Sequence, residues 1–328
     1  MIKYIMKIKT IFIGTSEFAV PILNACLNHE LLDLKAVITQ PDRPVGRKQD
    51  MQAPPVKSEL QITNYPARIS SHSNAGGELQ IEQPESIKEV ADEILEKYKP
   101  ELIIVASYGQ IIPKSILNYP KYGCLNFHGS LLPKLRGAVP IQMSILNGLE
   151  KTGVTLQKMV FKMDEGPIIS TREIALTGTE TYESLTKTLA ELSVEILNED
   201  LRDWIDGTIE AKEQNEQEAT YCYIKDTAKD KAEITADTSV EIAERMVRAF
   251  YPWPVAWITI KSGKNEGKRL KIFKSRISDL KSEENALTVS MDDNNLVLKL
   301  KDGCLIMEEV QLEGKDKRSG EDYLWLVD

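Results

Sequence analysis

The chain has 328 residues, 42% of them hydrophobic, and a formal net charge of −9 at pH 7. This length is sufficient for two domains of ordinary size, each with its own core. Because no apolar run approaches a membrane span and residues 1–10 lack the apolar region and cleavage site of a signal peptide, we expect a cytoplasmic protein with no membrane partner. The acidic average argues mildly against nucleic acid as a partner, since phosphate binding depends on Lys and Arg.

Cysteine and histidine usage gives no sign of a metal centre. Cys26, Cys124, Cys222 and Cys304 are far apart and form no C-x-x-C pair, and the chain has three histidines. These spacings do not match a zinc cluster, so we expect reduced thiols and no bound metal.

The first elements in chain order predict an open parallel α/β sheet. Residues 10–13 have the pattern of a strand, the loop at 14–18 leads into a helix, and residues 33–40 form the next strand. This β-α-β order is typical of a parallel sheet. Only one glycine follows the first strand, so the G-x-G-x-x-G of dinucleotide-binding proteins is missing, and the phosphate-binding G-x-x-x-x-G-K-[ST] occurs nowhere.

The next stretch, residues 40–57, predicts an irregular and positively charged surface loop. Its prolines exclude regular structure, and Arg43, Arg47 and Lys48 supply the charge. Residues 58–81 include a polar, glycine-rich run, which predicts a surface insertion.

A helix and a central strand follow. A capping box from Ser86 to Glu89 predicts a helix over residues 90–98. The unbroken apolar run within residues 101–107 predicts a strand that is covered on both faces. Its exit loop, 107–113, lies where open α/β sheets bind ligands, beyond the carboxyl ends of the strands.

Residues 125–128 place an amide and an imidazole on one face of a predicted strand. Side chains alternate along a strand, so Asn126 and His128 point the same way. An Asn amide donates a hydrogen bond without titrating, and a His passes protons near neutral pH, which together suit acyl transfer through an oxyanion. Asp164, just before a Glu-Gly-Pro turn, is the candidate carboxylate for fixing the tautomer of His128.

On its own, an Asn-x-His pair also fits a half-buried structural histidine at the end of a strand. The residues that follow favour a functional interpretation. Gly129 and Ser130 supply a tight turn, and residues 131–133 form an apolar ledge on which a flat aromatic ligand fits. Residues 137–140 then read as a helix start with proline in the first turn.

The chain changes character at residues 206–219. This run is rich in Glu and Gln and has no apolar pattern, whereas the helix predicted before it, 183–201, has the apolar spacing of a core helix. We therefore expect a linker at 206–219, between a domain at residues 1–205 and another at residues 220–328.

The second domain has the pattern of a small β-barrel. Thr238 and Glu241 form a capping box that begins a helix ending at Phe250. Short strands follow at residues 255–260, 269–276, 286–291, 296–301 and 305–312. Strands of this number and length are typical of a barrel of the oligonucleotide-binding (OB) type. Residues 260–280 hold seven basic and two acidic side chains, which predicts a basic face on an acidic protein.

The motifs around Asn126 resemble those of the formyltransferases that use 10-formyltetrahydrofolate. In that family N-x-H-x-S-L-L-P, R-G and a later D-x-G-x-I form the active site. The chain has them in this order at residues 126–133, 136–137 and 164–168. The resemblance implies a Rossmann-like formyltransferase sheet, 10-formyltetrahydrofolate as the formyl donor, and catalysis by Asn126, His128 and Asp164.

The same resemblance assigns binding residues. It implies that the folate lies against two groups, namely Ser130, Leu131, Leu132 and Pro133, and Tyr108, Gly109, Gln110 and Ile111. It also places Phe18 near the methionine side chain of the acceptor, although a core aromatic on the first helix explains Phe18 equally well.

Within this family the chain looks most like the methionyl-tRNA formyltransferases. The shared runs are A-x-P-I-Q at residues 138–142, R-P-x-G-R at 43–47, P-P-V-K at 54–57 and R-A-F-Y-P-W-P at 248–254. The resemblance implies that a monomer transfers the formyl group to the α-amino group of methionyl-initiator tRNA. It implies tRNA contacts by Arg43, Arg47, Lys48, Lys268, Arg269 and Lys271.

Three other interpretations are open at this point. The same chemistry on a sugar amine or on glycinamide ribotide leaves the basic loop and the basic barrel unexplained. An RNA-binding protein with an inactive α/β domain has no need to keep Asn126, His128 and Asp164. Serine hydrolysis through Ser130 lacks the G-x-S-x-G motif and a placed acid–base partner.

Overall fold

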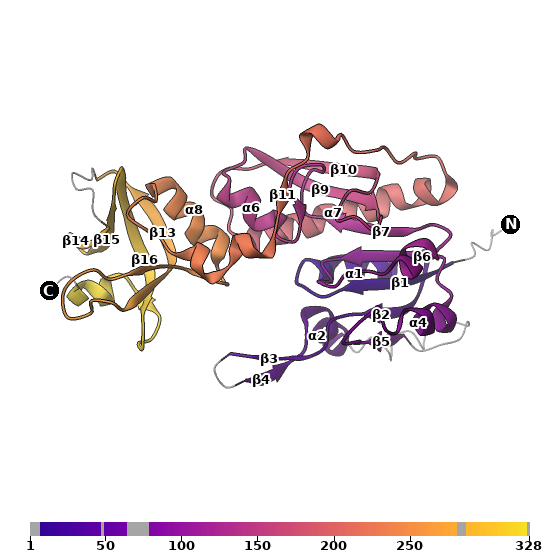
Figure 1. The fold of residues 1–328 in the computed structure, drawn as a ribbon, viewed down its shortest axis with the longest axis horizontal. Helices are drawn as coiled ribbons and strands as arrows, with labels where there is room; N and C mark the ends of the chain where they lie inside the picture. Colours follow the sequence, from indigo (N-terminus) through magenta and orange to yellow (C-terminus); the bar gives the residue numbers. More distant parts are fainter. Residues whose placement is uncertain (1–6, 47–48, 64–78, 281–286, 327–328) are drawn as a thin grey trace. The chain divides into compact units, whose positions relative to one another are not determined.

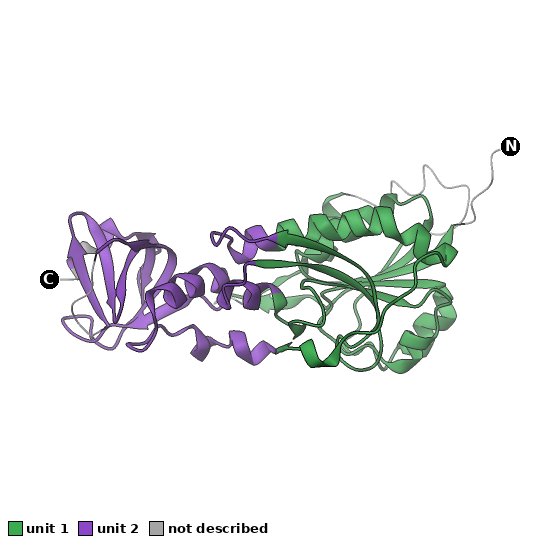
Figure 2. Cartoon of the chain, turned by 90° about the horizontal axis from the view of Figure 1, so that it is seen from above, with its two compact units in different colours: residues 1–140, 151–174, 186–221 green, residues 141–150, 175–185, 222–328 purple. Residues whose placement is uncertain are grey.

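The computed structural model describes residues 7–46, 49–63, 79–280 and 287–326, so residues 64–78 of the predicted insertion lie outside it. Contacts divide the chain into two compact units, coloured separately in Figure 2. Unit 1 comprises residues 1–140, 151–174 and 186–221, and unit 2 comprises residues 141–150, 175–185 and 222–328. In the described ranges, no helix is long and apolar enough to cross a membrane.

Unit 1 is built on a seven-stranded sheet with the order β10-β9-β7-β6-β1-β2-β5 (Figure 1). The strands are β1 (Ile8–Gly14), β2 (Leu32–Ile38), β5 (Gln80–Glu82), β6 (Leu102–Ala106), β7 (Cys124–His128), β9 (Lys151–Lys158) and β10 (Ile168–Ala175). β1 pairs in parallel with β2 and β6, as do β6 with β7 and β2 with β5, whereas β9 runs antiparallel to β7. The predicted open, mostly parallel sheet is confirmed.

The sheet of unit 1 is buried on both faces. Ile11 and Ile13 of β1 share a core with α4 (Ala91–Tyr98) and α5 (Lys114–Asn118). Phe12, which lies between them and points to the opposite face, is buried as well. Burial on both faces explains why the central strand β6 is an unbroken apolar run. Unit 1 also contains α1 (Ala19–Asn28), α2 (Pro55–Ile62) and most of the long α7 (Tyr182–Asp206).

The expectation of an irregular loop over residues 40–57 is wrong. Strands β3 (Arg43–Val45) and β4 (Asp50–Gln52) pair as an antiparallel hairpin, and α2 begins at Pro55. Proline is tolerated in the hairpin because each strand of a two-stranded ribbon is an edge. Proline is also compatible with the first turn of a helix, where its missing N–H has no helical partner to lose.

The predicted capping box at Ser86 and Glu89 does not form, although the helix that follows it does. Helix α4 begins at Ala91 without a side-chain cap. The N–H of Glu89 instead donates to the carbonyl of Ser86 at 3.2 Å, which closes a turn. This turn is held in place because Ile87 is buried and its N–H donates to Oε1 of Gln110 at 2.9 Å.

Unit 2 contains an antiparallel sheet with the order β12-β13-β16-β15-β14, and β17 pairs with β16. The strands are β12 (Ala256–Thr259), β13 (Arg269–Ser278), β14 (Thr288–Asp292), β15 (Asn295–Leu300), β16 (Gly303–Leu312) and β17 (Arg318–Ser319). Helix α8 (Val240–Phe250) packs on β12, β13 and β16 and shares one apolar core with them. The expected run of short strands after a helix is confirmed.

Helix α8 is capped one residue later than the sequence predicts. Its N-cap is Ser239, whose side chain accepts the N–H of Ile242 at 3.2 Å. Thr238 accepts the N–H of Thr235 at 3.0 Å and thereby closes the turn before the helix. Thr238 and Ser239 are adjacent, and both have a hydroxyl that can cap a helix. The capping-box spacing favours Thr238, whereas the structure uses Ser239.

Two segments that precede residue 186 belong to unit 2. Leu146, the last residue of α6 (Pro140–Leu146), packs against the core of unit 2. Arg248 of α8 donates to the carbonyl of Glu180 at 2.6 Å. These contacts explain why residues 141–150 and 175–185 group with the antiparallel sheet.

The Glu- and Gln-rich run at residues 206–219 is part of unit 1. Lys212 forms a β-bridge with Ile168 of β10, and the side chain of Gln214 donates to the carbonyl of Asp164. The remaining short elements are β8 (Arg136–Gly137), β11 (Tyr221–Cys222) and 3-10 turns at Glu216–Glu218, Ile224–Thr227, Lys229–Ala232 and Glu321–Leu326.

Candidate active site

Strands β7 and β9 bring four polar side chains to one face of the sheet. In this antiparallel pair Asn126 lies opposite Gln157, and His128 lies opposite Thr155. Residues directly opposite each other on antiparallel strands project from the same face. All four residues are buried. The end of β7 therefore presents two amides, a hydroxyl and an imidazole in a setting with little water.

The ring of His128 faces a protein group at each nitrogen. Nε2 lies 2.9 Å from the carbonyl oxygen of Leu135. A carbonyl oxygen only accepts, so Nε2 carries the proton of the neutral ring and Nδ1 keeps its lone pair. Nδ1 lies 3.7 Å from Oδ2 of Asp164. The tautomer is thus set by Leu135 rather than by Asp164, and Asp164 contributes a nearby negative charge.

Asp164 is held by contacts from three separate segments. Its Oδ2 accepts the N–H of Gly137 and its Oδ1 accepts Nε2 of Gln157, both at 2.8 Å. Its carbonyl accepts Nε2 of Gln214 at 2.7 Å. Its φ of 53° is left-handed, a conformation that Asp tolerates better than most residues. Together these contacts fix the carboxylate beside His128.

The carboxamide of Asn126 is available to a substrate. No other residue in the described ranges hydrogen-bonds it, and its backbone is fixed by pairing with Val105 and Gln157. A fixed amide N–H can donate to a developing oxyanion while a neighbouring imidazole accepts a proton. The arrangement therefore suits acyl transfer to a nucleophile that loses a proton as it attacks.

The turn after β7 is closed by two hydroxyl groups. Ser130 Oγ donates to the carbonyl of Lys134 at 2.6 Å. Thr155 Oγ1 donates to the carbonyl of Ser130 at 2.7 Å and accepts the N–H of Leu132 at 3.0 Å. The Ser130 hydroxyl is buried and already bonded, which argues against serine hydrolysis. Contact of a folate with Ser130, Leu131, Leu132 and Pro133 is still a prediction.

The loop after β6 is tied to the loops after β1 and β2 at one edge of the sheet. The carbonyl of Tyr108 accepts Oγ1 of Thr15 and Nε2 of Gln40, both at 3.1 Å. The Tyr108 hydroxyl is buried without a partner among the residues that the structure describes, and burial raises the pKa of Tyr108 to about 12. Gly109 has a φ of 87°, which glycine adopts without strain. Ile111 is 79% exposed.

Gln110 and Phe18 both make contacts within the protein that stabilise the fold. Nε2 of Gln110 lies 3.3 Å from the carbonyl oxygens of Pro84 and Glu85, so its side chain joins two loops. Phe18 is buried at the start of α1, as a core aromatic would be. The contacts of these two residues with the folate and with the methionine side chain are still predictions.

Arg136 is a buried charged residue whose surroundings the sequence did not reveal. Its guanidinium donates to both carboxylate oxygens of Glu216, at 2.9 and 2.7 Å, and to the hydroxyl of Tyr221 at 3.2 Å. Nε donates to Oε1 of Gln214 at 3.0 Å. The bonds with Glu216 raise the pKa of Arg136 and lower that of Glu216. Glu216 lies 80 residues further along the chain, so no local motif joins it to Arg136.

The hairpin of β3 and β4 carries the first group of predicted tRNA contacts. Arg43 is exposed there and pairs with Glu85 at 2.7 Å. Arg47 and Lys48 lie outside the described residues.

The second group lies on β13 of unit 2. Arg269 and Lys271 are exposed and share one face of the strand, because Leu270 between them is buried on the other. The guanidinium of Arg269 lies 4.5 Å from the centre of the Trp257 ring. Lys268 is exposed and donates to Asn265 at 3.0 Å. Cations beside an aromatic ring suit contacts with phosphates and bases, and such contacts are still predictions here.

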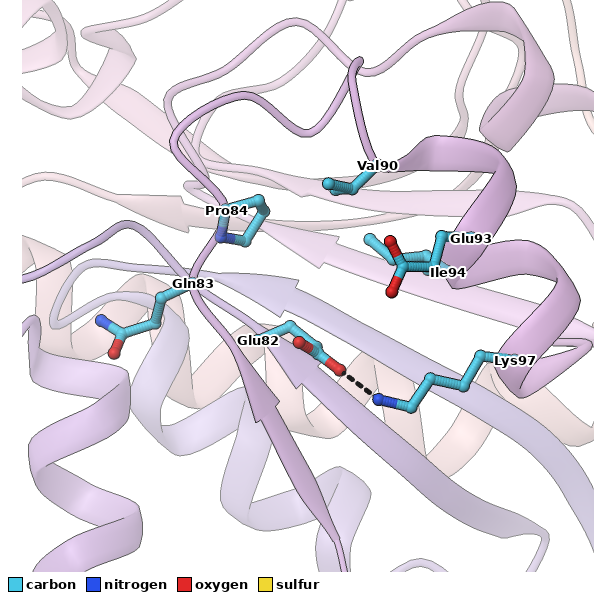
Figure 3. A pocket seen from close by; sticks show the side chains of 7 residues that line it. All are labelled: Glu82, Gln83, Pro84, Val90, Glu93, Ile94 and Lys97. Atoms are coloured by element: carbon cyan, nitrogen blue, oxygen red, sulfur yellow. Dashed lines mark hydrogen bonds and ion pairs between the residues drawn. The ribbon is translucent and has the colours of Figure 1, made fainter.

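A pocket of about 190 Å³ lies between β5, the loop after it and α4 (Figure 3). Lys97 pairs there with Glu82 at 2.8 Å, and the hydroxyl of Tyr98 donates to the same carboxylate. The lysine of the pocket is therefore already paired, and none of the three predicted catalytic residues lines it. Over the described ranges, no cluster of three His, Cys, Asp or Glu side chains could hold a metal ion.

The comparisons with known proteins agree with this fold and identify the family. Residues 6–201 match the family described as "Formyl transferase", and residues 227–325 match "Formyl transferase, C-terminal domain". The structure resembles that of HypX from Aquifex aeolicus, with a TM-score of 0.63 and 16% identity over 97% of this chain and 47% of HypX. It also resembles WlaRD, named as a sugar 3N-formyl transferase, with a TM-score of 0.61 and 18% identity over 95% of this chain and 100% of WlaRD. The fold and the two family matches together define a formyltransferase.

The sequence relatives narrow the class. The protein named methionyl-tRNA formyltransferase in Bacillus licheniformis is 36% identical over 96% of this chain and 94% of its own length. Its counterpart in Bacillus subtilis is 34% identical over the same shares of the two chains. This chain belongs to the methionyl-tRNA formyltransferase family.

Proposed function

We propose that this chain transfers the formyl group of 10-formyltetrahydrofolate to the α-amino group of methionyl-initiator tRNA, giving N-formylmethionyl-tRNA for translation initiation. The observation that carries the proposal is the meeting of Asn126, His128 and Asp164 at the end of β7, in a chain whose relatives bear that name. A folate donor is supported by two structural neighbours, which are described with tetrahydrofolic acid and with 5-N-formyl-THF.

The residues present fit a folate donor. The Asn126 carboxamide has no partner among the described residues, and the exposed side chain of Ile111 offers apolar surface to a flat ring. When bound, 10-formyltetrahydrofolate supplies the formyl group as an amide of N10. We assign the folate site to the loops at residues 107–113 and 130–133.

Each of the three polar residues has its own task in this proposal. Asn126 donates to the formyl oxygen as it becomes negative. Nδ1 of His128, which has a lone pair, accepts the proton that the attacking amine releases and returns it to the leaving nitrogen. Asp164, 3.7 Å away, stabilises the imidazolium that forms in between.

Asn126→Ala tests the assignment of the oxyanion donor. Turnover should fall by about two to three orders of magnitude, as when an oxyanion-hole donor is removed elsewhere, with less effect on tRNA affinity. Turnover is measured with labelled 10-formyltetrahydrofolate, and affinity by filter retention of initiator tRNA. Asn118→Ala, at an exposed position of α5, is the matched control and should keep both. Near-normal turnover in Asn126→Ala would remove Asn126 from the mechanism.

We further propose the division of labour between the two parts of the chain. Residues 1–205 would carry out catalysis, and residues 220–328 would bind tRNA, working as a monomer in the cytoplasm. The predicted tRNA contacts are Arg43, Arg47, Lys48, Lys268, Arg269 and Lys271, and Phe18 would neighbour the methionine side chain. The exposed cations on the β3–β4 hairpin and on β13 support this part of the proposal.

A sugar amine is the weaker alternative acceptor. WlaRD has the same fold, but at 18% identity the likeness is limited to the fold. The methionyl-tRNA formyltransferases are about twice as similar in sequence, at 36% identity over nearly the whole chain. The choice of acceptor therefore follows the sequence relatives.

A further inference from the structure

The loop that carries Asp164 is held by the side chain of Gln214. Nε2 of Gln214 donates to the carbonyl of Asp164 and to the carbonyl of Gly166, both at 2.7 Å. These two carbonyls bracket the turn in which Asp164 has its left-handed φ of 53°. Gln214 comes from the run that follows α7, so this contact brings together segments that are 50 residues apart.

The orientation of the Gln214 amide is unambiguous. Its Oε1 accepts Nε of Arg136 at 3.0 Å. Arg can only donate and carbonyl oxygens can only accept, so the amide must place its oxygen toward Arg136 and its nitrogen toward the loop. Arg136 in turn is fully buried, and its two terminal nitrogens donate hydrogen bonds to the carboxylate of Glu216. A buried, always-charged residue therefore fixes which way the amide points.

We propose that Gln214 is a positioning residue for catalysis, which holds the main chain of Asp164 so that its carboxylate stays beside His128. The inference rests on the proposed function, since it requires that Asp164 acts in the reaction. The carboxylate itself is held by Gly137 and Gln157, but these bonds at 2.8 Å can form only where the main chain puts Asp164. Gln214 supplies that placement.

The size of the expected effect follows from the geometry. Nδ1 of His128 and Oδ2 of Asp164 are 3.7 Å apart, without a direct hydrogen bond to pull them together. A displacement of the order of 1 Å at a reacting group can cost about 100-fold in rate. Loss of the two bonds from Gln214 should therefore lower kcat by about 10- to 100-fold, with the KM for both substrates changed little.

Gln214→Glu is the variant that isolates these two bonds. Glutamate has the same shape and can still accept Nε of Arg136, but it turns the donor into an acceptor that faces two carbonyls. Gln214→Leu, which has no polar atoms, is the second variant and serves if glutamate prevents folding. Gln217→Leu is the matched control, because Gln217 is exposed in the same run. The control should keep kcat.

A double-mutant cycle with Asp164→Asn separates positioning from general damage. If Gln214 acts through Asp164, its substitution lowers kcat about 10- to 100-fold in the native background. In the Asp164→Asn background the same substitution lowers kcat less than about three-fold. Both effects are measured by single turnover with excess enzyme. An equal loss in both backgrounds, or no loss in the native one, overturns the inference. Full activity in Asp164→Asn alone overturns the proposed role of Asp164 first, and the inference falls with it.

Discussion

Thr155 shows how one hydroxyl group can organise the turn that follows β7. It donates to the carbonyl of Ser130 and accepts the N–H of Leu132, and Thr155 is fully buried. Thr155→Val keeps the shape of the side chain but leaves two backbone groups without a partner. The free energy of unfolding should fall by about 1–3 kcal/mol, measured by urea unfolding. Thr155→Ser, which keeps the hydroxyl, should lose clearly less, and equal losses in the two variants would contradict this account.

Cys124 should make stability depend on pH in the alkaline range. Burial raises the pKa of its thiol to about 12. In the unfolded chain a thiol ionises near pH 8.5, so between about pH 9 and pH 12 the unfolded state has lost a proton that the folded state keeps. The free energy of unfolding therefore falls as pH rises, by up to about 1.4 kcal/mol per pH unit from this group.

Cys124→Ala tests that pH dependence. Other groups titrate in the same range, so the informative quantity is the difference between the two proteins. The variant should be less stable at neutral pH because it leaves a small cavity, but its free energy of unfolding should fall less steeply between pH 9 and pH 10. Parallel pH profiles from urea unfolding would show that the buried thiol is not the cause.

At the scale of single elements, the start of α8 offers a direct test of its cap. Ser239 accepts the N–H of Ile242, so Ser239→Ala should lower the free energy of unfolding by about 1 kcal/mol. Ser239→Asp keeps an acceptor and adds a negative charge at the helix N-terminus, so it should retain most of the stability. If Ser239→Ala cost nothing while Thr238→Ala did, the cap would be Thr238, as the sequence pattern predicted.

The sequence is most informative where the alternation of side chains along a strand decides which way each one points. Asn126 and His128 could be assigned to one face because strands alternate, and β6 to the centre of a sheet because its run is unbroken. The positions of Gln157 and Thr155 beside Asn126 and His128 could not be predicted. They depend on the register of β7 with β9, which decides which residues face each other. That register is set by contacts distant in sequence.

Local rules failed where several residues satisfied the same rule or where distant contacts outweighed it. Ser239 and Thr238 both qualify as caps of α8. At residues 86–89, the hydrogen bond from the N–H of Ile87 to Gln110 holds a turn in place of the predicted capping box. The hairpin of β3 and β4 does not follow from the sequence pattern, because proline is rare inside strands and is tolerated only at an edge.

At the scale of the whole molecule, the net charge of the chain does not show where its exposed basic side chains lie. The chain carries a net charge of −9, yet β13 exposes Arg269 and Lys271 beside Trp257, and the β3–β4 hairpin exposes Arg43. An average over the chain therefore says little about a partner that touches only a few side chains. The run at residues 206–219 is a similar case, because its polar composition suggests a linker while Gln214 and Glu216 hold Arg136.

The identity of the acceptor is tested most directly by offering the purified protein several amines together with labelled 10-formyltetrahydrofolate. The acceptors are methionyl-initiator tRNA, an amino sugar nucleotide and glycinamide ribotide, each at the same concentration. The account predicts label on the methionyl-tRNA alone, and loss of that label by about two to three orders of magnitude in Asn126→Ala. Label on the amino sugar nucleotide or the ribotide, with none on methionyl-tRNA, would contradict it.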